Sequence, residues 1–193
     1  MCQFLFYYLF NDSFRIELKS FIFVFFLLKM EISIRPFQTQ DTPALLDIIN
    51  EAITNSTALY DYHPRTLEHQ QKLFEIQLHK GFPINVAVVN ELVVGYGTYS
   101  DFRYKDAYQF TVEHSVYVHQ NYKGNGIGKR LLKSLVDSAK AQNKHTIIGV
   151  IDAENEESIM FHKLMGFEIV GTIRETGFKF GRWLDSIFMQ KML

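Results

Sequence analysis

A short glycine-rich turn is the first feature of the sequence whose residue types and spacing could do chemistry. It follows a β-branched run, precedes an amphipathic run, and consists of Lys123, Gly124, Asn125, Gly126, Ile127, Gly128 and Lys129. Glycines let a backbone approach a ligand closely. The first amides of a helix point outward, unpaired, at the positive end of the helix dipole. This combination predicts a site for a phosphate-bearing ligand, and a glycine-rich connection without any ligand is the alternative.

Two well-known nucleotide-binding patterns do not fit this turn. A Walker A loop would need Gly in place of Lys123 and Ser or Thr in place of Arg130. A dinucleotide-binding Gly-x-Gly-x-x-Gly pattern that started at Gly124 would need Gly in place of Lys129. The turn is therefore a candidate phosphate site of another kind.

A single carboxylate, Glu113, interrupts the strand-like run over residues 108–118. A glutamate with an ordinary pKa of about 4.3 is poorly matched to an ammonium group. Burial beside a cleft would raise this pKa and suit the residue to general-base catalysis, directly or through a water. In a regular strand Glu113 shares a face with Tyr117 and opposes Val116. A solvent-facing or salt-bridged glutamate is the alternative.

The surrounding elements alternate between strands and helices. Helices are expected to begin near Asp41, Thr66, Ile127 and Asn155, where capping residues or glycines precede apolar positions at helical spacing. Short apolar or alternating runs predict strands over residues 32–36, 84–89, 92–99, 108–118, 146–151, 167–173 and 183–189. This order predicts a mixed α/β sheet in one domain.

Residues 1–29 differ from the rest of the chain. Their apolar run over residues 21–28 is shorter than the roughly 20 residues that a membrane-spanning helix needs. Lys29, Met30 and Glu31 follow it, so no small residues mark a signal-peptide cleavage site. We expect translation to start at Met30, with residues 1–29 non-native or disordered and the folded domain over residues 30–193. A membrane-surface anchor is the alternative for this segment.

Composition narrows the class of function. Twenty Lys and Arg residues nearly balance twenty-one Asp and Glu residues, giving a net charge of −1. A general nucleic-acid binder normally carries a basic excess, so this class is not expected. The only cysteine is Cys2, which excludes an intrachain disulfide and a cysteine-based zinc site. We expect no metal site and a cytoplasmic location.

The glycine turn resembles the pyrophosphate loop of the GNAT superfamily of N-acetyltransferases, with Lys123, Gly126 and Gly128 at the matching spacing. Lys123 stands where the family usually has Arg or Gln, and it supplies charge without a planar fork. The run from Asn155 to Phe167 is similar to the second half of the family pattern. The stretches over residues 108–118 and 177–185 are similar to the phosphinothricin and methionine sulfoximine acetyltransferase branch.

The resemblance implies a fold and a cofactor. The GNAT fold is an α+β arrangement whose mixed, mostly antiparallel, twisted sheet of about seven strands is flanked by about four helices and splayed around the fourth and fifth strands. A bulge in the fourth strand would free backbone groups for acetyl-CoA, and the amide of Val116 would face the thioester oxygen. The implied contacts of coenzyme A are Val116, Tyr117, Val118, Lys123, Gly124, Asn125, Gly126, Ile127, Gly128, Lys129, Asn155 and Ser158.

The implied reaction moves the acetyl group to the primary amine of a small amino-acid-like acceptor by direct attack in a ternary complex. Glu113 is the expected base. His162, seven residues after Asn155, is the expected acid for the leaving thiolate, because imidazole titrates near working pH. A histidine that only packs in the fold is the alternative for His162, and a plain helix cap is the alternative for Asn155.

The resemblance also implies contacts with the acceptor. A guanidinium can clamp a carboxylate or a phosphinate, which makes Arg103 the leading candidate. The full set is Arg103, Tyr104, Lys105, Asp106, Glu113, His114 and Ser115. Strand alternation turns His114 away from Glu113, so no chemical step is assigned to it. For Lys105 and Asp106 the alternative is a solvated turn.

Other functions remain open at this point. The chain could be an acyl-CoA-binding sensor without turnover, or a transferase that acts on protein N-termini or aminoglycosides. An aminoglycoside pocket should be rich in carboxylates, and Arg103 and Lys105 argue against it. The resemblance implies a homodimer, and we expect neither a nucleic-acid partner nor a membrane for the domain.

Overall fold

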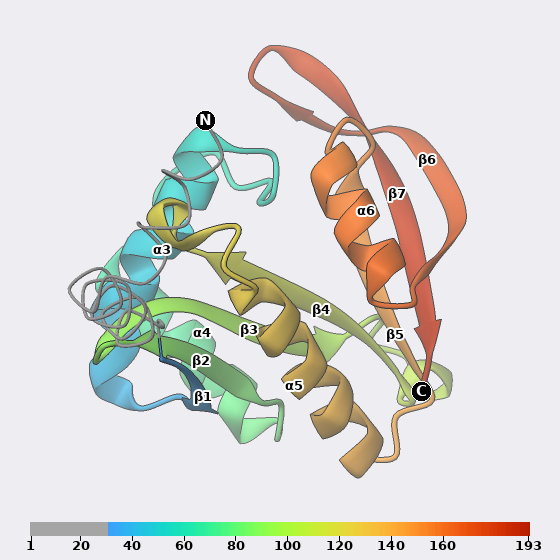
Figure 1. Cartoon of the computed structure of the whole chain (residues 1–193). Helices are drawn as coiled ribbons and strands as arrows, with labels where there is room; N and C mark the ends of the chain where they lie inside the picture. Colours follow the sequence, from blue (N-terminus) through green and yellow to red (C-terminus); the bar gives the residue numbers. More distant parts are fainter. Residues whose placement is uncertain (1–30) are drawn as a thin grey trace, which may run out of the picture. The chain divides into compact units, whose positions relative to one another are not determined.

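Seven strands form one sheet in the order β1-β2-β3-β4-β5-β7-β6 (Figure 1). The computed structural model describes residues 31–193, so the expectation for residues 1–29 lies outside the described residues. Neighbouring strands are antiparallel except β4 and β5, which are parallel. The strands are β1 (Ile32–Pro36), β2 (Ile84–Val89), β3 (Leu92–Asp101), β4 (Thr111–Val118), β5 (Thr146–Asp152), β6 (Glu168–Lys179) and β7 (Arg182–Met192).

Four helices of the described region cover the two faces of this sheet: α3 (Thr42–Asn55), α4 (Leu67–His79), α5 (Ile127–Ala141) and α6 (Glu156–Leu164). Leu45 and Phe74, from α3 and α4, join a core cluster with Tyr96 on one face of the sheet. Leu132 of α5 belongs to a second cluster on the other face, against which Phe161 of α6 packs. This confirms the mixed sheet of seven strands with four helices. Among residues 31–193, no helix is long and apolar enough to cross a membrane.

The strands β4 and β5 separate partway along their length. They pair only at Thr111↔Thr146, Val112↔Ile147 and Glu113↔Ile148. Beyond Glu113, β4 stays paired with β3 as far as Val118, while β5 stays paired with β7 (Figure 1). We call the space between residues 114–118 of β4 and 149–152 of β5 the fork. It confirms the predicted splay.

The fork opens without the expected bulge in β4. The pairing of β3 with β4 runs from Gly95↔Val118 to Asp101↔Val112 without a register shift. Side chains of β4 therefore alternate regularly, which places Glu113 on the face of Tyr117 and opposite Val116. The separation arises because β5 leaves the pairing, not because β4 carries an extra residue.

Two boundaries differ from the sequence-based expectation. β4 begins at Thr111 rather than Tyr108, because residues 106–108 form a 3₁₀ turn. β6 and β7 form a longer hairpin than expected, which turns at Phe180 and Gly181, both with positive φ. Most side chains of the edge strand β6 are exposed, so no alternation of apolar and polar residues marked its full length.

Candidate active site

The glycine turn places the open N-terminus of α5 beside the fork. Gly124 and Gly126 have φ angles of +78° and +77°, in the left-handed region that L side chains rarely adopt. A Cβ at either position would meet no atom within 4 Å, so the requirement for glycine here is conformational rather than steric. Gly126 is the N-cap of α5, and no side chain caps this end. The first amides of α5 are thus available to an anion.

The rest of the turn stabilises this arrangement. The side-chain amide of Asn125 donates to the carbonyl oxygens of Tyr122 and Lys123, at 3.2 Å each, so it fixes the turn. Lys123 and Lys129 are exposed. A Cβ on Gly128 would lie 3.7 Å from the ring of Phe161, which brings the start of α5 against α6.

The edge of β4 that faces the fork continues this open surface. Because pairing with β5 ends at Glu113, the backbone groups of Val116 and Val118, which point toward the fork, are not used by the sheet, whereas those of Tyr117 point toward β3. Asn155 caps α6 by accepting from the Ser158 amide at 3.0 Å. This uses the carbonyl oxygen of its side chain and leaves its NH₂ group as a donor.

A cavity of about 270 Å³ lies next to the fork, on the face of β4 that carries Glu113, between β3, β4 and α4. Glu113, Ser115 and Tyr117 line it from β4. The adjoining elements contribute Leu59, Arg65, Gln70, Leu73, Phe74, Gln77, Tyr96 and Thr98, among others. The volume lies at the lower end of ligand pockets, which typically span about 300–1,000 Å³. It suits a small molecule better than an aminoglycoside or a folded protein terminus.

Burial adjusts the acidity of the groups in this cavity. Burial raises the pKa of the Glu113 carboxyl above its usual value, and the charge of Arg103 partly opposes this. Burial also raises the pKa of Tyr117 to about 12, so this phenol stays protonated. A carboxylate with a raised pKa is a stronger base, as proton abstraction from an ammonium requires.

Two histidines meet on the side of β4 that faces α6. The Nε2 atoms of His114 and His162 are 3.2 Å apart, and the rings stack with centroids 5.1 Å apart. His162 Nδ1 lies 2.6 Å from the carbonyl oxygen of Ser158, which can only accept, so this nitrogen carries a proton. In a neutral pair, His114 Nε2–H then donates to His162 Nε2.

The surroundings of this pair favour its neutral form. Burial and the neighbouring His162 lower the pKa of His114 to about 3. Burial lowers the pKa of His162, and its bond to the Ser158 carbonyl partly opposes this. Both ring nitrogens of His162 are already hydrogen-bonded. An imidazolium at His162, one of the two forms in which it could act as the acid, is therefore disfavoured.

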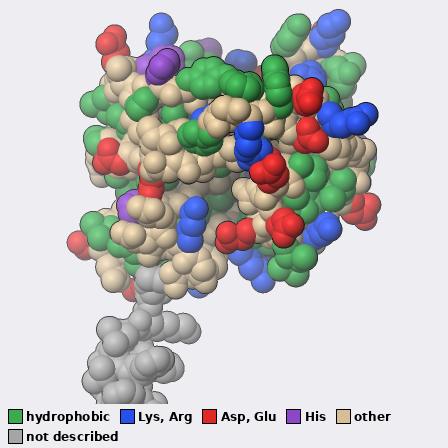
Figure 2. Space-filling view, turned by 90° about the horizontal axis from the view of Figure 1, so that it is seen from above, with side chains coloured by type: hydrophobic (Ala, Val, Ile, Leu, Met, Phe, Trp, Pro, Cys, Tyr) green, Lys and Arg blue, Asp and Glu red, His purple; other side chains and the backbone are tan. Residues whose placement is uncertain are grey.

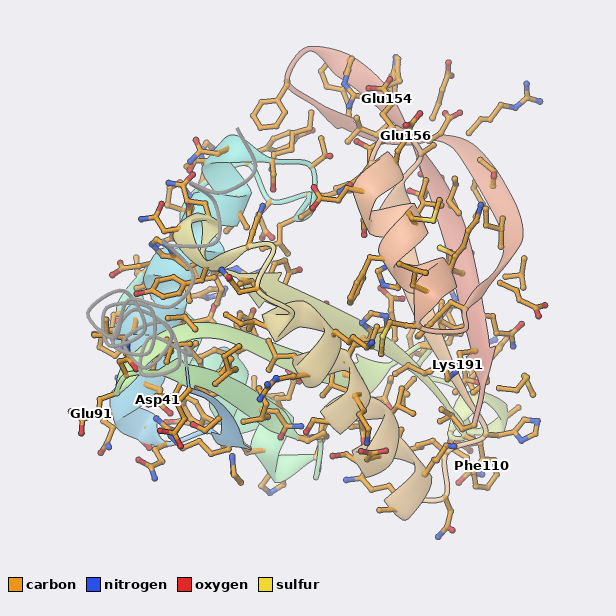
Figure 3. The ribbon with its side chains drawn as sticks, viewed as in Figure 1. Asp41, Glu91, Phe110, Glu154, Glu156 and Lys191 are labelled. Atoms are coloured by element: carbon orange, nitrogen blue, oxygen red, sulfur yellow. The ribbon has the colours of Figure 1, made fainter. Side chains whose placement is uncertain are left out.

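Helix α6 is held at both ends, which fixes the position of His162. Asn155 caps its first turn, near Glu154 and Glu156 (Figure 3). At the other end the Lys191 ammonium donates to the Met165 carbonyl at 2.9 Å.

His114 gives a prediction for the pH dependence of stability. Because its folded-state pKa lies below its unfolded value, the unfolded chain binds the extra proton first as the pH falls. We expect the free energy of unfolding to drop between about pH 7 and about pH 5, and to drop less in a His114→Phe variant. Urea unfolding at both pH values measures this.

The matched control is His145→Phe, because His145 is exposed. This variant should keep the pH dependence of the wild type. If His114→Phe also kept it, the neutral buried pair would be contradicted.

The residues predicted to contact the acceptor do not all come together. Glu113 and Ser115 line the cavity, and Arg103 lies close enough to affect Glu113. Tyr104, Lys105 and Asp106 are exposed and are not among the described residues that line the cavity. His114 was expected among the acceptor contacts, but it does not line the cavity. Strand alternation places it on the face of β4 opposite to Glu113, where it is buried against His162.

Helix α4 supplies cavity residues that the sequence reasoning missed. Gln70 and Gln77 lie on the face of α4 that carries the buried Phe74, and Gln70 is only 2% exposed. Polar residues spaced on the apolar face of a helix were the signal for this site. Arg65, just before the helix, was also missed.

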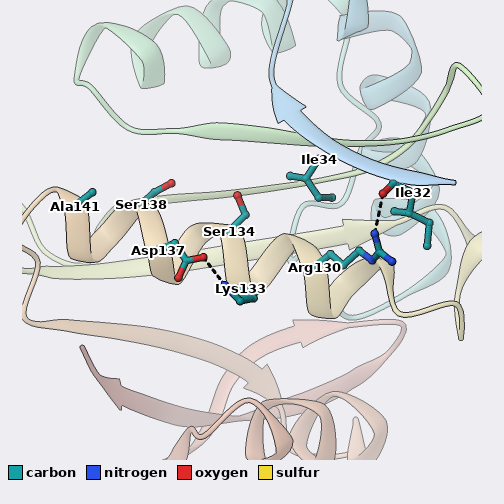
Figure 4. A pocket seen from close by; sticks show the side chains of 8 residues that line it. All are labelled: Ile32, Ile34, Arg130, Lys133, Ser134, Asp137, Ser138 and Ala141. Atoms are coloured by element: carbon teal, nitrogen blue, oxygen red, sulfur yellow. Dashed lines mark hydrogen bonds and ion pairs between the residues drawn. The ribbon is translucent and has the colours of Figure 1, made fainter.

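A larger groove of about 610 Å³ lies elsewhere, between β1 and α5 (Figure 4). Arg130 donates to the Ile32 carbonyl at 2.8 Å, and Lys133 pairs with Asp137 at 2.7 Å, so its charged groups are already engaged. None of the predicted site residues lines it. It is therefore not the candidate active site.

Comparisons with known proteins agree with this geometry. The acetyltransferase (GNAT) domain family matches residues 34–188. The L-methionine sulfoximine/L-methionine sulfone acetyltransferase of Pseudomonas paraeruginosa is 42% identical over 163 residues, covering 83% of this chain and 94% of that protein. A crystal structure of an N-acetyltransferase from Staphylococcus aureus Mu50 is 40% identical, with a TM-score of 0.83, covering 84% of this chain and 98% of that one.

A second solved structure contains the cofactor. It is a GNAT superfamily phosphinothricin acetyltransferase from Sinorhizobium meliloti in complex with AcCoA, 36% identical, with a TM-score of 0.82, covering 85% of this chain and 89% of that one. The match of the family to most of the chain, together with the fork and the open helix N-terminus, shows that the protein belongs to the GNAT family of acetyl-CoA-dependent acetyltransferases.

Proposed function

We propose that this enzyme transfers the acetyl group of acetyl-CoA to the primary amine of a small amino-acid-like acceptor, of the methionine sulfoximine or phosphinothricin type. Direct attack takes place in a ternary complex. One observation carries the proposal, which is that the same strand borders both binding spaces. The unpaired edge of β4 borders the fork, and the side chain of Glu113 on β4 lines the 270 Å³ cavity. The named relatives act on such acceptors.

The residues around the fork fit acetyl-CoA. The amides of Ile127, Gly128 and Lys129, at the uncapped end of α5, would hold the pyrophosphate, with Lys123 adding charge. Residues 116–118 would pair with the pantetheine arm as an added strand, and Asn155 would donate to it. When bound, the cofactor supplies an activated acetyl thioester.

Glu113 accepts the proton that the acceptor ammonium must lose before its nitrogen can attack. Its half-buried position raises the carboxyl pKa toward the range in which such a transfer is efficient. The amide of Val116 would donate to the oxyanion that develops on the thioester carbonyl. Ser115 and Tyr117, on the face of Glu113, line the space for the acceptor.

His162 remains the proposed proton donor to the departing thiolate. Because Ser158 and His114 occupy its two ring nitrogens in the neutral pair, His162 first has to take up a proton from solvent on Nε2, which replaces the hydrogen bond from His114. The imidazolium then gives this proton to the thiolate and returns to the neutral form, at the cost that burial imposes on the charged ring.

A thiol-release assay tests the proposed function. Acetyl-CoA is offered with methionine sulfone, methionine sulfoximine, phosphinothricin, a peptide amine, a polyamine and an aminoglycoside. Turnover should be fastest with the first three. Acetyl-CoA binding without turnover on any amine would instead establish a sensor, and fastest turnover on the aminoglycoside or peptide would establish another transferase.

We also propose a homodimer and a cytoplasmic location. The hairpin of β6 and β7 exposes Phe178, Phe180 and Trp183, a group of large apolar side chains of the kind found at subunit contacts. Figure 2, a view from above, shows apolar side chains beside charges of both signs on that face of the molecule. Sedimentation equilibrium should give twice the chain mass of 22.6 kDa, and a monomer would contradict the dimer. The location rests on the sparing use of cysteine.

A further inference from the structure

A guanidinium nitrogen without a partner lies beside the acceptor cavity. Arg65 lines the cavity together with Glu113. Its Nη2 donates to Asp61 at 2.9 Å and its Nη1 to Gln70 at 3.1 Å. Its Nε is buried and has no hydrogen-bond partner among the described residues. A buried donor without an acceptor lowers the stability of the folded protein. An unpaired Nε–H at this position therefore points to a ligand atom or a water that accepts its hydrogen bond.

The backbone of Arg65 is fixed from a second direction. Its amide donates to Asn50 Oδ1 at 2.7 Å, and its carbonyl accepts from Asn50 Nδ2 at 3.0 Å. The residue then leads into Thr66, whose side chain caps α4. The guanidinium is therefore held in place by α3, α4 and the segment between them before any acceptor arrives. A preorganised donor binds an oxyanion with little loss of conformational entropy.

The donor geometry of Arg65, rather than an excess of positive charge, suits an anion. The cavity lining holds one carboxylate, Glu113, and two cations, Arg65 and Lys80, which pair with Asp61 at 2.9 Å and with Asp101 at 3.3 Å. The ion pair with Asp61 uses Nη2 of Arg65 but leaves the Nε–H free. The Nε and Nη2 edge of a guanidinium presents two parallel N–H groups, which match the two oxygens of a carboxylate, phosphinate or sulfone.

The length of the cavity separates this oxyanion site from the base. Glu113 and Tyr117 both line it, and strand geometry puts their Cα atoms about 13 Å apart. The ring of Tyr117 packs at a tilt against that of Tyr96, with centroids 5.4 Å apart, and Tyr96 lines the cavity together with Arg65. The charge of Arg65 acts on both Tyr96 and Tyr117, where it opposes the rise of their pKa values, so Arg65 lies toward the Tyr117 end of the cavity. The acceptor would place its oxyanion at that end and its amine toward Glu113.

We propose that Arg65 is a specificity-determining residue that binds an oxyanion of the acceptor through its Nε and Nη2 edge. The inference rests on the proposed function and extends it: acceptors must carry an oxygen anion or a strongly polar oxygen group away from the amine. Both the α-carboxylate and the side-chain oxygens of such an acceptor can accept hydrogen bonds from Arg65, and the test below distinguishes between these two groups.

The test compares Arg65→Gln with the wild type on three acceptors: L-methionine sulfone, its carboxamide, and L-norleucine. Affinity is measured as KM in the thiol-release assay, or as Ki against the sulfone for an analogue that is not acetylated. For the sulfone, KM should rise at least about tenfold while kcat changes little, because Glu113 is intact. The carboxamide should be insensitive to the substitution if Arg65 binds the carboxylate, and norleucine should be insensitive if it binds the side-chain oxygens.

Asp61→Asn is the matched control. It breaks the same ion pair in the same segment but keeps the Nε–H donor, so KM for the sulfone should stay within about twofold of the wild type. Arg65→Lys keeps the charge without the two-donor edge and should give an intermediate KM.

Three results would overturn the inference: an unchanged KM in Arg65→Gln, an equal rise on all three acceptors, or the same rise in Asp61→Asn. The last two would show that Arg65 only supports the segment. A wild-type enzyme that releases thiol with none of the amino acids would overturn the proposed function itself.

Discussion

Replacing Glu113 by Gln is expected to lower kcat/KM by about 10²–10⁴-fold while leaving acetyl-CoA affinity unchanged. Glutamine has nearly the same shape as glutamate but cannot accept the ammonium proton. In the proposed complex the cofactor would lie along the open edge of β4 and at the start of α5, whereas Glu113 faces the cavity. Thiol release measures turnover, and calorimetric titration measures the affinity for acetyl-CoA.

The pH–rate profile makes this test specific to proton transfer. Because burial raises the pKa of Glu113, the wild type should lose activity as the pH falls through this raised value, when the carboxyl becomes protonated. The variant should lack this acid limb. Glu91→Gln, at an exposed carboxylate in the turn between β2 and β3 (Figure 3), should behave as wild type. An acid limb that persists in Glu113→Gln would refute Glu113 as the base.

Replacing Gly126 by Val is expected to raise the Kd for acetyl-CoA by at least about tenfold, or about 1.4 kcal/mol. The φ of +77° at Gly126 costs an ordinary L residue about 1–2 kcal/mol. A β-branched residue relieves that strain by moving the turn, and the amides of Ile127 to Lys129 then lose their alignment. Titration of each variant with acetyl-CoA measures the change.

Two controls separate loss of the anion site from general destabilisation. Gly81→Val introduces the same strain, because Gly81 has a φ of +76° and open space around it, but it lies at the end of α4. It should lower Tm without changing the affinity for acetyl-CoA. Gly126→Asn should retain most of the affinity, because Asn tolerates the left-handed region. Equal losses in Gly126→Val and Gly81→Val would remove the turn from cofactor binding.

The local elements were predictable from the sequence because their signals are local. Leu131 and Leu135 recur at helical spacing in α5, and residues 84–89 form a β-branched run, so each could be assigned from its neighbours alone. Glu113 stood out as a charged residue in a strand. Its face relative to Tyr117 followed from alternation.

The rest of the site depends on contacts between distant segments. The position of the fork is set by where β5 stops pairing with β4, and nothing near Glu113 marks it. The contact between His114 and His162 joins a strand to a helix across the fold. In the sequence Arg65 is only a residue before a helix cap, and it is the packing of α4 on β2 and β3 that brings it to the cavity.

The central claim is that β4 holds the cofactor at its open edge and the base in the adjoining cavity. A crystal structure of Glu113→Gln with acetyl-CoA and methionine sulfone tests it most directly. We expect the pyrophosphate on the amides of residues 127–129, the thioester near Val116, and the acceptor amine facing residue 113. An acceptor bound outside this cavity, or a pyrophosphate away from the start of α5, would contradict the claim.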